Sequence, residues 1–290
     1  TGFSQCHVAV LLVDARHGVV EQTRRHALLA TRFGGKRLVF CVNKMDLVDF
    51  DAATFRRIEA ELRRLGEGLG LRPDAVDALP ISALRGDHVI EPSASLSWFD
   101  GPSLLERLES LPLPRDTAED EHGRMAVQLV LRPHGDAAGR RYAGKVVRGR
   151  LALGEEVTVL PSGRRSTIVS LETLDGPLPS AIAPQDVSVR LAHQLDVGRG
   201  DILVAGACPE LHRTATATLC WMSEREGHAA QTFILKHQSR RVKCRLRHIV
   251  HHVDLDTMGE ARCDEPLRLN DVARVALDLA EPLPIEGSDG

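Results

Sequence analysis

The sequence has 290 residues, a length that usually accommodates about two domains, or three small ones. Hydrophobic residues make up 43% of it and aromatic residues only 3%, which excludes a disordered chain and predicts cores built from aliphatic side chains. Acidic and basic residues nearly balance, at 40 against 37, so the net charge of -3 indicates neither a nucleic acid nor a membrane as a partner.

The first part of the sequence alternates predicted strands and helices. Nearly continuous apolar runs are typical of strands that are buried on both faces. The predicted strands cover residues 7–13, 38–42 and 78–82. Apolar residues at helical spacing predict helices over residues 21–33, 54–65 and 102–111. Strands that alternate with helices favour a parallel α/β sheet.

The pattern changes after Pro112. Short runs of alternating polarity then follow one another without intervening helices, and turn signals such as Pro161-Ser162-Gly163 separate them. The first set covers 125–131, 144–147, 156–160, 166–171 and 187–191, and the second covers 214–222, 231–235, 242–246, 248–253 and 272–279. Each set predicts a small β-barrel.

These patterns divide the chain into domains. We expect an α/β domain over residues 1–112, and a linker over 113–123, which is acidic, polar and contains proline. A first barrel is then expected over 124–207 and a second over 211–290.

Six cysteines are scattered through the chain, and none forms a CxxC pair. We interpret them as reduced thiols of a cytosolic protein, because neither a disulfide framework nor a zinc ribbon fits this spacing. No apolar run reaches the roughly 18–20 residues of a membrane span. The first residues also lack the basic and apolar segments of a signal peptide. The sequence therefore predicts a cytoplasmic protein with no membrane partner.

The segment Asn43-Lys44-Met45-Asp46 directly follows a predicted buried strand and matches NKxD, the guanine-reading motif of GTPases. Guanine presents two adjacent donors, the ring N1–H and the exocyclic amine, and an ionised Asp46 can accept from both. Adenine would leave the carboxylate unpaired, so such a site can discriminate by roughly 10⁴-fold. Lys44 can lay its alkyl stem along the base, and Asn43 can tie the loop to its neighbours.

A second motif, Ile81-Ser82-Ala83-Leu84, ends the next predicted strand. In GTPases an SAL-type loop over Ser82, Ala83 and Leu84 places a backbone N–H on guanine O6. An ordinary Asn/Asp turn is the alternative for the first motif, and the ordered presence of both motifs argues against it. Both follow parallel strands, and the carboxyl ends of such strands are where ligand sites form.

Two other GTPase motifs do not occur in the sequence. It contains neither a GxxxxGK[ST] phosphate loop nor a DxxGH loop for Mg²⁺ and the attacking water. We therefore assign no catalytic residue and no metal ligand, and we expect these residues alone to be inactive as a GTPase.

At these motifs the sequence resembles the elongation-factor-Tu-like translational GTPase superfamily. Within it, the sequence is most similar to the GTPase subunit, or subunit 1, of bacterial sulfate adenylyltransferases. The similar segments are LLVDARHGVVEQTRRH, VNKMDLVD and PISALRGDHV, then AVQLVLRP, RYAGKVVRG and VTVLPSGRRST, and finally FILKHQSRRVKCRLRHIVHHVDLDT and LRLNDVARVALDLAEPL. The family has a full phosphate-binding half and usually continues past the last strand, so we expect this chain to be truncated at its N-terminus and at its C-terminus.

The resemblance implies a fold, a ligand and a partner. The fold is the C-terminal half of an α/β P-loop-type GTPase domain followed by two β-barrels. The ligand is GTP, held at Asn43, Lys44, Asp46, Ser82, Ala83 and Leu84, with Mg²⁺ bound only in the full-length protein. The partner is a small catalytic subunit that joins ATP and sulfate to give adenosine 5′-phosphosulfate. GTP hydrolysis is coupled to that uphill step of sulfate assimilation, which feeds cysteine biosynthesis.

Two other functions remain open at this point. The chain can be a translation-factor-like module that binds tRNA or another partner through its barrels, although its near-neutral charge and its LKH and LPSG stretches argue against that. It can also be a folded but inactive remnant.

Four clusters of charged residues have alternative interpretations. His248, His251 and His252 favour a polar strand face over a metal site, because neighbouring strand residues point to opposite faces. Residues 240–247 alternate basic with apolar, which favours a solvated strand face, then a docking face for an acidic partner, then nucleic acid. Arg140-Arg141 is a weak candidate for a site that binds sulfate or phosphate. Residues 24–26 (RRH) predict an exposed helix face or a subunit contact.

Overall fold

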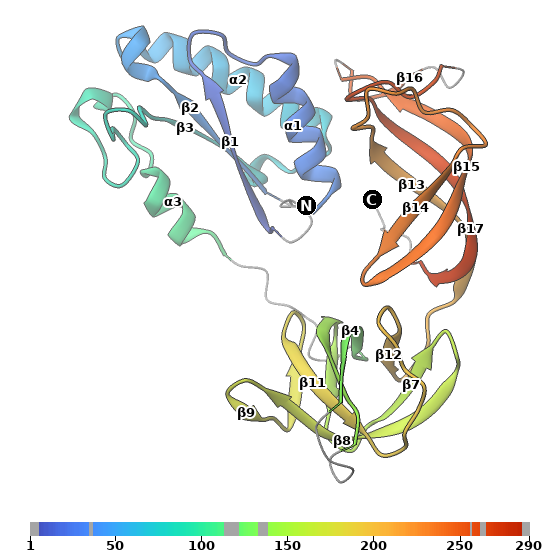
Figure 1. The fold of residues 1–290 in the computed structure, drawn as a ribbon. Helices are drawn as coiled ribbons and strands as arrows, with labels where there is room; N and C mark the ends of the chain where they lie inside the picture. The colour runs from blue at the N-terminus through green and yellow to red at the C-terminus, as the bar shows by residue number, and fades with distance from the viewer. Residues whose placement is uncertain are drawn as a thin grey trace.

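The computed structural model describes residues 6–34, 37–112, 122–132, 139–255, 257–261 and 265–285. They form an α/β part, a small closed barrel and a second β part that lies beside the α/β part (Figure 1). The predicted linker over 113–123 lies outside the described residues except for its last two positions.

The α/β part is built on a three-stranded parallel sheet of order β1-β2-β3. Its strands are β1 (Val8–Asp14), β2 (Arg37–Asn43) and β3 (Val76–Pro80), and its helices are α1 (Glu21–Arg32), α2 (Ala52–Gly68) and α3 (Leu104–Ser110). Short 3-10 helices cover Met45–Val48, Pro73–Ala75 and Ala94–Leu96. The central strand β2 is buried from Leu38 to Val42, which is why it reads as a continuous apolar run.

Each face of this sheet has its own apolar core. Helices α1 and α2 cover one face, where Leu28, Phe55 and Ile58 pack on alternate residues of the strands. The segment around α3 covers the other face, with Leu79 and Leu111 in its core. Within the described residues, strand β1 pairs only with β2, and its outward residue Leu12 is 64% exposed.

Capping side chains fix where the helices begin. The Asp51 carboxylate accepts from the backbone N–H and the hydroxyl of Thr54, so α2 begins two residues before the predicted start. Ser103 and Glu106 form a reciprocal capping box at α3. Side-chain N-caps therefore define where both helices begin.

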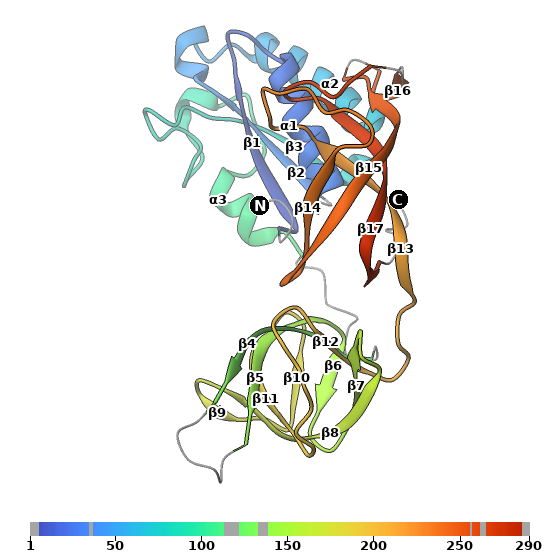
Figure 2. The same ribbon diagram turned by 45° about the vertical axis from the view of Figure 1, so that its right-hand side comes forward.

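The middle part is a closed antiparallel barrel (Figure 2). The strands follow the order β11-β5-β4-β12-β7-β8, and β8 pairs back with β11. They are β4 (Arg124–Leu131), β5 (Arg141–Arg148), β6 (Arg150–Ala152), β7 (Glu156–Leu160), β8 (Arg164–Thr173), β9 (Gly176–Pro177), β10 (Ser180–Ile182), β11 (Asp186–Leu191) and β12 (Ile202–Ala205). Tyr142 lies in the interior and donates its hydroxyl to the Leu195 carbonyl at 3.0 Å. The barrel predicted over this stretch is therefore present.

The second β part, called the last β part from here on, is an antiparallel sheet of order β13-β17-β15-β14, with the short β16 on β15. The strands are β13 (Leu211–Cys220), β14 (Thr232–His237), β15 (Arg240–Val253), β16 (Glu260–Ala261) and β17 (Val272–Pro284). Within the described ranges β13 and β14 remain the two edges, so the pairings do not close a second barrel. Trp221 and Leu267, which come from connecting segments, cover the apolar face instead.

The two predicted strands over 242–246 and 248–253 are one strand in the structure. The register of β15 against β17 shifts at Leu246/His248 and again at Ile249/His251. These bulges interrupt the alternation of polarity without ending the strand. The separation of the two strands in the sequence prediction was therefore wrong.

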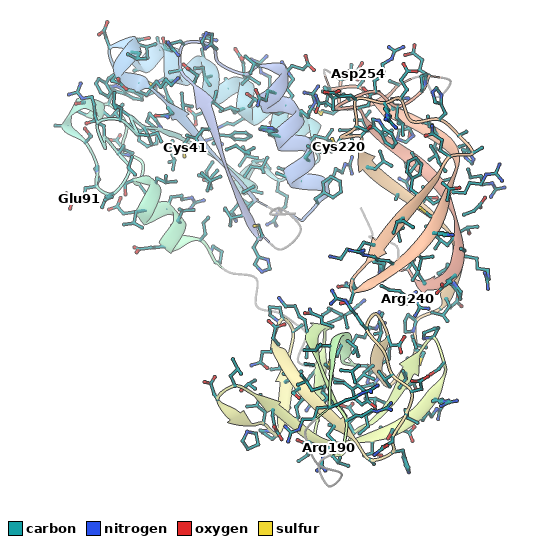
Figure 3. All side chains as sticks on the ribbon, viewed as in Figure 1. Cys41, Glu91, Arg190, Cys220, Arg240 and Asp254 are labelled. Carbon is teal, nitrogen blue, oxygen red and sulfur yellow. The ribbon has the colours of Figure 1, made fainter. Side chains whose placement is uncertain are left out.

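The last β part contacts both of the other parts. Val272 is buried in the same core as α1 and α2, and Val253 and Met258 pack against that core. On the barrel side, Arg240 Nη1 lies 3.3 Å from the Asp201 carboxylate (Figure 3). Among the helices that the structure describes, no segment combines the length and the hydrophobicity that crossing a bilayer requires.

Candidate functional site

The carboxyl ends of the parallel strands bring polar residues together at one edge of the sheet. Asp14 ends β1 and lies opposite Asn43, which ends β2. Ser82 follows β3 by two residues, and the backbone of Ile81 bridges to the β2 loop through a bond from Met45 N at 3.2 Å. The two sequence motifs thus lie side by side, as the order of parallel strands requires.

The Asn43 side chain joins the two motif loops. Its Oδ1 accepts from Lys44 N at 2.7 Å and from Ala83 N at 2.9 Å. Its backbone carbonyl accepts from Ala15 N at 2.9 Å, which ties in the loop after β1. One residue therefore fixes all three loops relative to one another, as the sequence analysis expected of it.

Asp46 is oriented by Ser82. The Ser82 hydroxyl donates to Asp46 Oδ1 at 2.6 Å, and Ser82 itself is completely buried. Asp46 Oδ2 accepts from no residue that the structure describes. A carboxylate held in this way keeps acceptor capacity on both oxygens, because each oxygen has two lone-pair directions.

Lys44 adopts the left-handed backbone conformation, with φ 64°. That conformation costs a non-glycine residue roughly 1–2 kcal/mol. The side chain reaches back to β1, where Nζ lies 2.9 Å from Asp14 Oδ2, and it remains 46% exposed. Its alkyl stem thus extends along the edge of the site.

Asp14 is a site residue that the sequence analysis did not single out. Arg16 binds its carboxylate with two side-chain hydrogen bonds, of 3.0 and 2.7 Å, and Lys44 adds a third. Hydrogen bonds from Arg16 first, and then from Lys44, hold the pKa of Asp14 far below its usual range. Asp14 is therefore ionised at neutral pH, and it positions Lys44. Its place at the end of a buried strand was the only signal for it in the sequence.

The loop from Ser82 to Asp87 is exposed at its tip. Leu84 is 89% exposed, and Ala83 N is already bonded to Asn43. Leu84 N donates to no residue in the described part of the chain. Of the two N–H groups at the tip, only that of Leu84 is thus open to a ligand in this arrangement.

Aromatic residues support the loop that follows Asp46. The Arg85 guanidinium lies over the Phe50 ring at 5.3 Å, and Trp98 Nε1 donates to the Phe50 carbonyl at 2.8 Å. Trp98 and Phe99 in turn each lie 5.5 Å from the Phe55 ring of α2. These contacts come from distant segments, and no local pattern in the sequence identifies them.

A shallow hollow of about 650 Å³ lies on the other side of the loop from Ser82 to Asp87. It is lined by Val10, Leu12 and Cys41 of the sheet, by loop residues between Ile81 and Ser93, and by Leu104 of α3. Burial raises the pKa of the Cys41 thiol to about 11, so Cys41 is a protonated core residue and not a nucleophile. Asn43, Lys44 and Asp46 do not line this hollow.

The histidine cluster has separate partners instead of one shared centre. His251 Nδ1 lies 3.4 Å from Glu260, and His252 Nδ1 lies 3.6 Å from Asp271, while His248 is exposed. The described residues contain no group of three or more His, Cys, Asp and Glu side chains that could hold a metal ion.

The two arginine clusters are also engaged in other contacts. Arg141 pairs with Glu172, so it is not a free anion receptor. Arg25 pairs with Glu21 at 2.6 Å and lies near Cys220 of the last β part. Arg24 and Arg25 are half-buried, and only His26 is exposed, so the predicted exposed helix face was wrong for the two arginines.

Comparisons with known families identify the outer parts of the chain. Residues 1–119 match the family described as the elongation factor Tu GTP binding domain. Residues 214–289 match the family described as the GTP-eEF1A C-terminal domain-like. A solved structure of sup35 complexed with GDP shares the fold, with a TM-score of 0.55 at 22% identity, over 98% of this chain and 73% of that one.

Curated relatives align along nearly the whole chain. Sulfate adenylyltransferase subunit 1 of Aeromonas hydrophila is 37% identical over 287 residues, which are 99% of this chain and 59% of that protein. That of Bacteroides thetaiotaomicron is 39% identical over 98% of this chain and 59% of the relative. The bifunctional enzyme CysN/CysC of Mycobacterium tuberculosis is 37% identical over 99% of this chain and 47% of its own length. The chain thus spans about three fifths of the subunit 1 proteins that it matches.

Proposed function

The chain is a homologue of sulfate adenylyltransferase subunit 1, in the translational GTPase superfamily, and from this we propose that it is the guanine-reading and barrel portion of a GTP-binding subunit. In this proposal, GTP hydrolysis drives the formation of adenosine 5′-phosphosulfate from ATP and sulfate. The catalytic work belongs to a smaller companion subunit, and the assembly acts in the cytoplasm. We also propose the domain boundaries expected from the sequence, with domains over residues 1–112, 124–207 and 211–290 and a linker over 113–123.

The observation that carries the nucleotide assignment is the bond between Ser82 and Asp46. It links the two motifs and presents the Asp46 carboxylate at the open edge of the sheet. Two adjacent donors on guanine match such a carboxylate, whereas adenine offers none at those positions. The donor and acceptor groups therefore fit a guanine base.

Each loop residue then has a role toward the base. Asp46 accepts from the base, Lys44 lies along its plane, and the backbone N–H of Leu84 faces O6, while the N–H of Ala83 is held by Asn43. Asn43 and Ser82 hold these groups in place. The bound nucleotide supplies the phosphoryl-transfer chemistry. The described residues contain no group of three or more His, Cys, Asp and Glu side chains that could hold a metal ion. The family resemblance implies that Mg²⁺ binds in the full-length protein.

The experiment that tests this function measures adenosine 5′-phosphosulfate formed by the full-length protein together with its companion subunit. We expect the yield at equilibrium to rise when GTP is supplied, and to stay low with a non-hydrolysable GTP analogue, because only hydrolysis provides the free energy. An equal yield with and without GTP would rule out the coupling. Salt-dependent tRNA binding in place of sulfate activation would favour the translation-factor alternative.

A further inference from the structure

The outward face of the hairpin formed by β14 and β15 carries a block of basic side chains. Lys236, Arg241, Lys243 and Arg245 are all exposed, while the residues between those of β15, such as Val242, face the core. In the strand register Lys236 lies directly opposite Arg241, and Ile234 lies opposite Lys243. We call these four cations and Ile234 the basic face.

Among the described residues, one acidic side chain lies directly opposite a cation of the basic face in the strand register. None of the four makes an ion pair within the described part of the molecule, and the acidic side chain nearest in register is Asp278 of β17, opposite Arg245. Arg240 lies at the start of the same strand (Figure 3) and is by contrast bound to both Asp201 and Glu281. The lack of partners is therefore a property of this face and not of the whole strand.

Such a face lowers the stability of the isolated sheet. Like charges directly opposite each other on adjacent strands are unfavourable, and Lys236 and Arg241 occupy that relation. The chain as a whole is slightly acidic, with a net charge of -3, so the clustering does not follow from composition. A partner that brings carboxylates to the face would relieve the repulsion.

We propose that the basic face binds a carboxylate-rich surface of a protein partner. Ile234, which is 60% exposed, provides an apolar contact among the cations. An apolar centre with a charged rim is typical of protein interfaces, and complementary charge sets their specificity and association rate. Nucleic acid fits less well, because the face offers no aromatic side chain for stacking and Phe233 points into the core. This inference rests on the charges of the face alone and is independent of the nucleotide assignment.

The experiment uses poly-L-glutamate as the acidic polypeptide probe and single-stranded poly-uridylate as the nucleic-acid probe. The test variant is Lys243→Glu with Arg245→Glu. The control is Arg56→Glu with Arg164→Glu, which makes the same change in total charge at exposed cations of α2 and the barrel. Both variants alter exposed side chains, and a thermal melt of each checks that it is folded.

We expect the parent and the control to bind poly-L-glutamate alike, and the test variant to bind it about tenfold more weakly or worse. Binding should also weaken as ionic strength rises from about 0.1 M to about 1 M, because the Debye length falls from about 10 Å to about 3 Å. Equal loss in the control, no binding by the parent, or tighter binding of poly-uridylate than of poly-L-glutamate would overturn the proposal.

Discussion

The hydroxyl of Ser82 holds Asp46 in the geometry that we assign to guanine recognition. Replacing Ser82 with alanine removes this bond and leaves the carboxylate free to rotate. Hydrogen bonds to charged groups contribute about 1.5–3 kcal/mol, so we expect guanine nucleotide affinity of the full-length protein to fall by about tenfold or more. Competition against a fluorescent GTP analogue measures the change.

Ser93 provides a matched control for this substitution. Its hydroxyl donates to Asp87 Oδ1 at 2.7 Å, in the same loop region but away from the Asp46 carboxylate. Ser93→Ala should lower stability to a similar degree while leaving nucleotide affinity close to that of the parent. Equal losses of affinity in both variants would show that Ser82 acts only through the stability of the loop.

The salt-bridged Asp14 makes a contribution to stability that depends on pH. Its folded-state pKa is depressed by hydrogen bonds from Arg16 and Lys44. The contribution is therefore present above the unfolded-state pKa of about 3.9 and is lost as pH falls below that value toward the folded-state pKa. We expect Asp14→Asn to lower the urea midpoint at about pH 7 and to lower it less at about pH 3.

Asp49→Asn serves as the comparison for Asp14→Asn. Asp49 is exposed and makes no ion pair with a described residue, so its substitution should change the midpoint little at either pH. A deficit of the Asp14 variant that is the same at both pH values would mean that lost packing, and not the carboxylate charge, accounts for the effect.

Part of this site could be predicted from the sequence. Asn43, Lys44 and Asp46 occupy fixed offsets after a buried strand, and the structure places Ser82 and Ala83 beside them. Asp14 and Arg16 could not be predicted, because their bonds depend on how the loop after β1 turns. The stacking of Arg85 on Phe50 likewise joins two loops whose separation only the fold determines.

At the level of elements, the turn before β12 packs tightly against the last β part. Gly200 has φ +95°, and a Cβ there would lie 2.9 Å from Arg240 Cα. Gly200→Ala would thus combine an unfavourable backbone conformation with a clash against backbone. We expect a loss of about 2–5 kcal/mol in the free energy of unfolding, measured by urea denaturation.

Gly163→Ala distinguishes the cost of the backbone conformation from the cost of the clash. Gly163 also has a positive φ, of +71°, but a Cβ there would meet no atom within 4 Å. Gly163→Ala should therefore cost only the backbone term, about 1–2 kcal/mol. If Gly200→Ala costs no more than that, the barrel and the last β part do not pack as closely as described.

Hydrophobic periodicity predicted the presence of the helices and strands better than it predicted where strands end and how they pair. Helices α1 and α2 and the barrel strands arise from patterns of three or more apolar residues, which packing reinforces. The bulges of β15 break the alternation, so that one strand resembles two. Closure of a sheet depends on pairings between distant strands, and for that reason the open edge of β14 was not foreseen.

For the whole molecule, the arrangement of the three parts follows from contacts that only the fold creates. The last β part shares a core with α1 and α2 through Val272 and is joined to the barrel through Arg240 and Asp201. Direct side-chain contacts therefore join the last β part to both of its neighbours.

The most direct test of the central claim is the nucleotide specificity of Asp46→Asn in the full-length protein. An asparagine amide can still accept from Ser82, so the loop is retained. The amide places a donor opposite a donor of guanine, but it complements the carbonyl that xanthine carries at position 2. The measurement compares GTP and XTP as supporters of adenosine 5′-phosphosulfate formation with the companion subunit, and Asp49→Asn is the control.

We predict that Asp46→Asn lowers the affinity for GTP by about a hundredfold, because each lost buried hydrogen bond costs about 1–3 kcal/mol. We also predict that XTP then supports sulfate activation better than GTP does. The Asp49→Asn control should keep the preference of the parent for GTP. If Asp46→Asn instead retains the parent's GTP affinity and gains nothing from XTP, Asp46 does not read the base and the account of this site is contradicted.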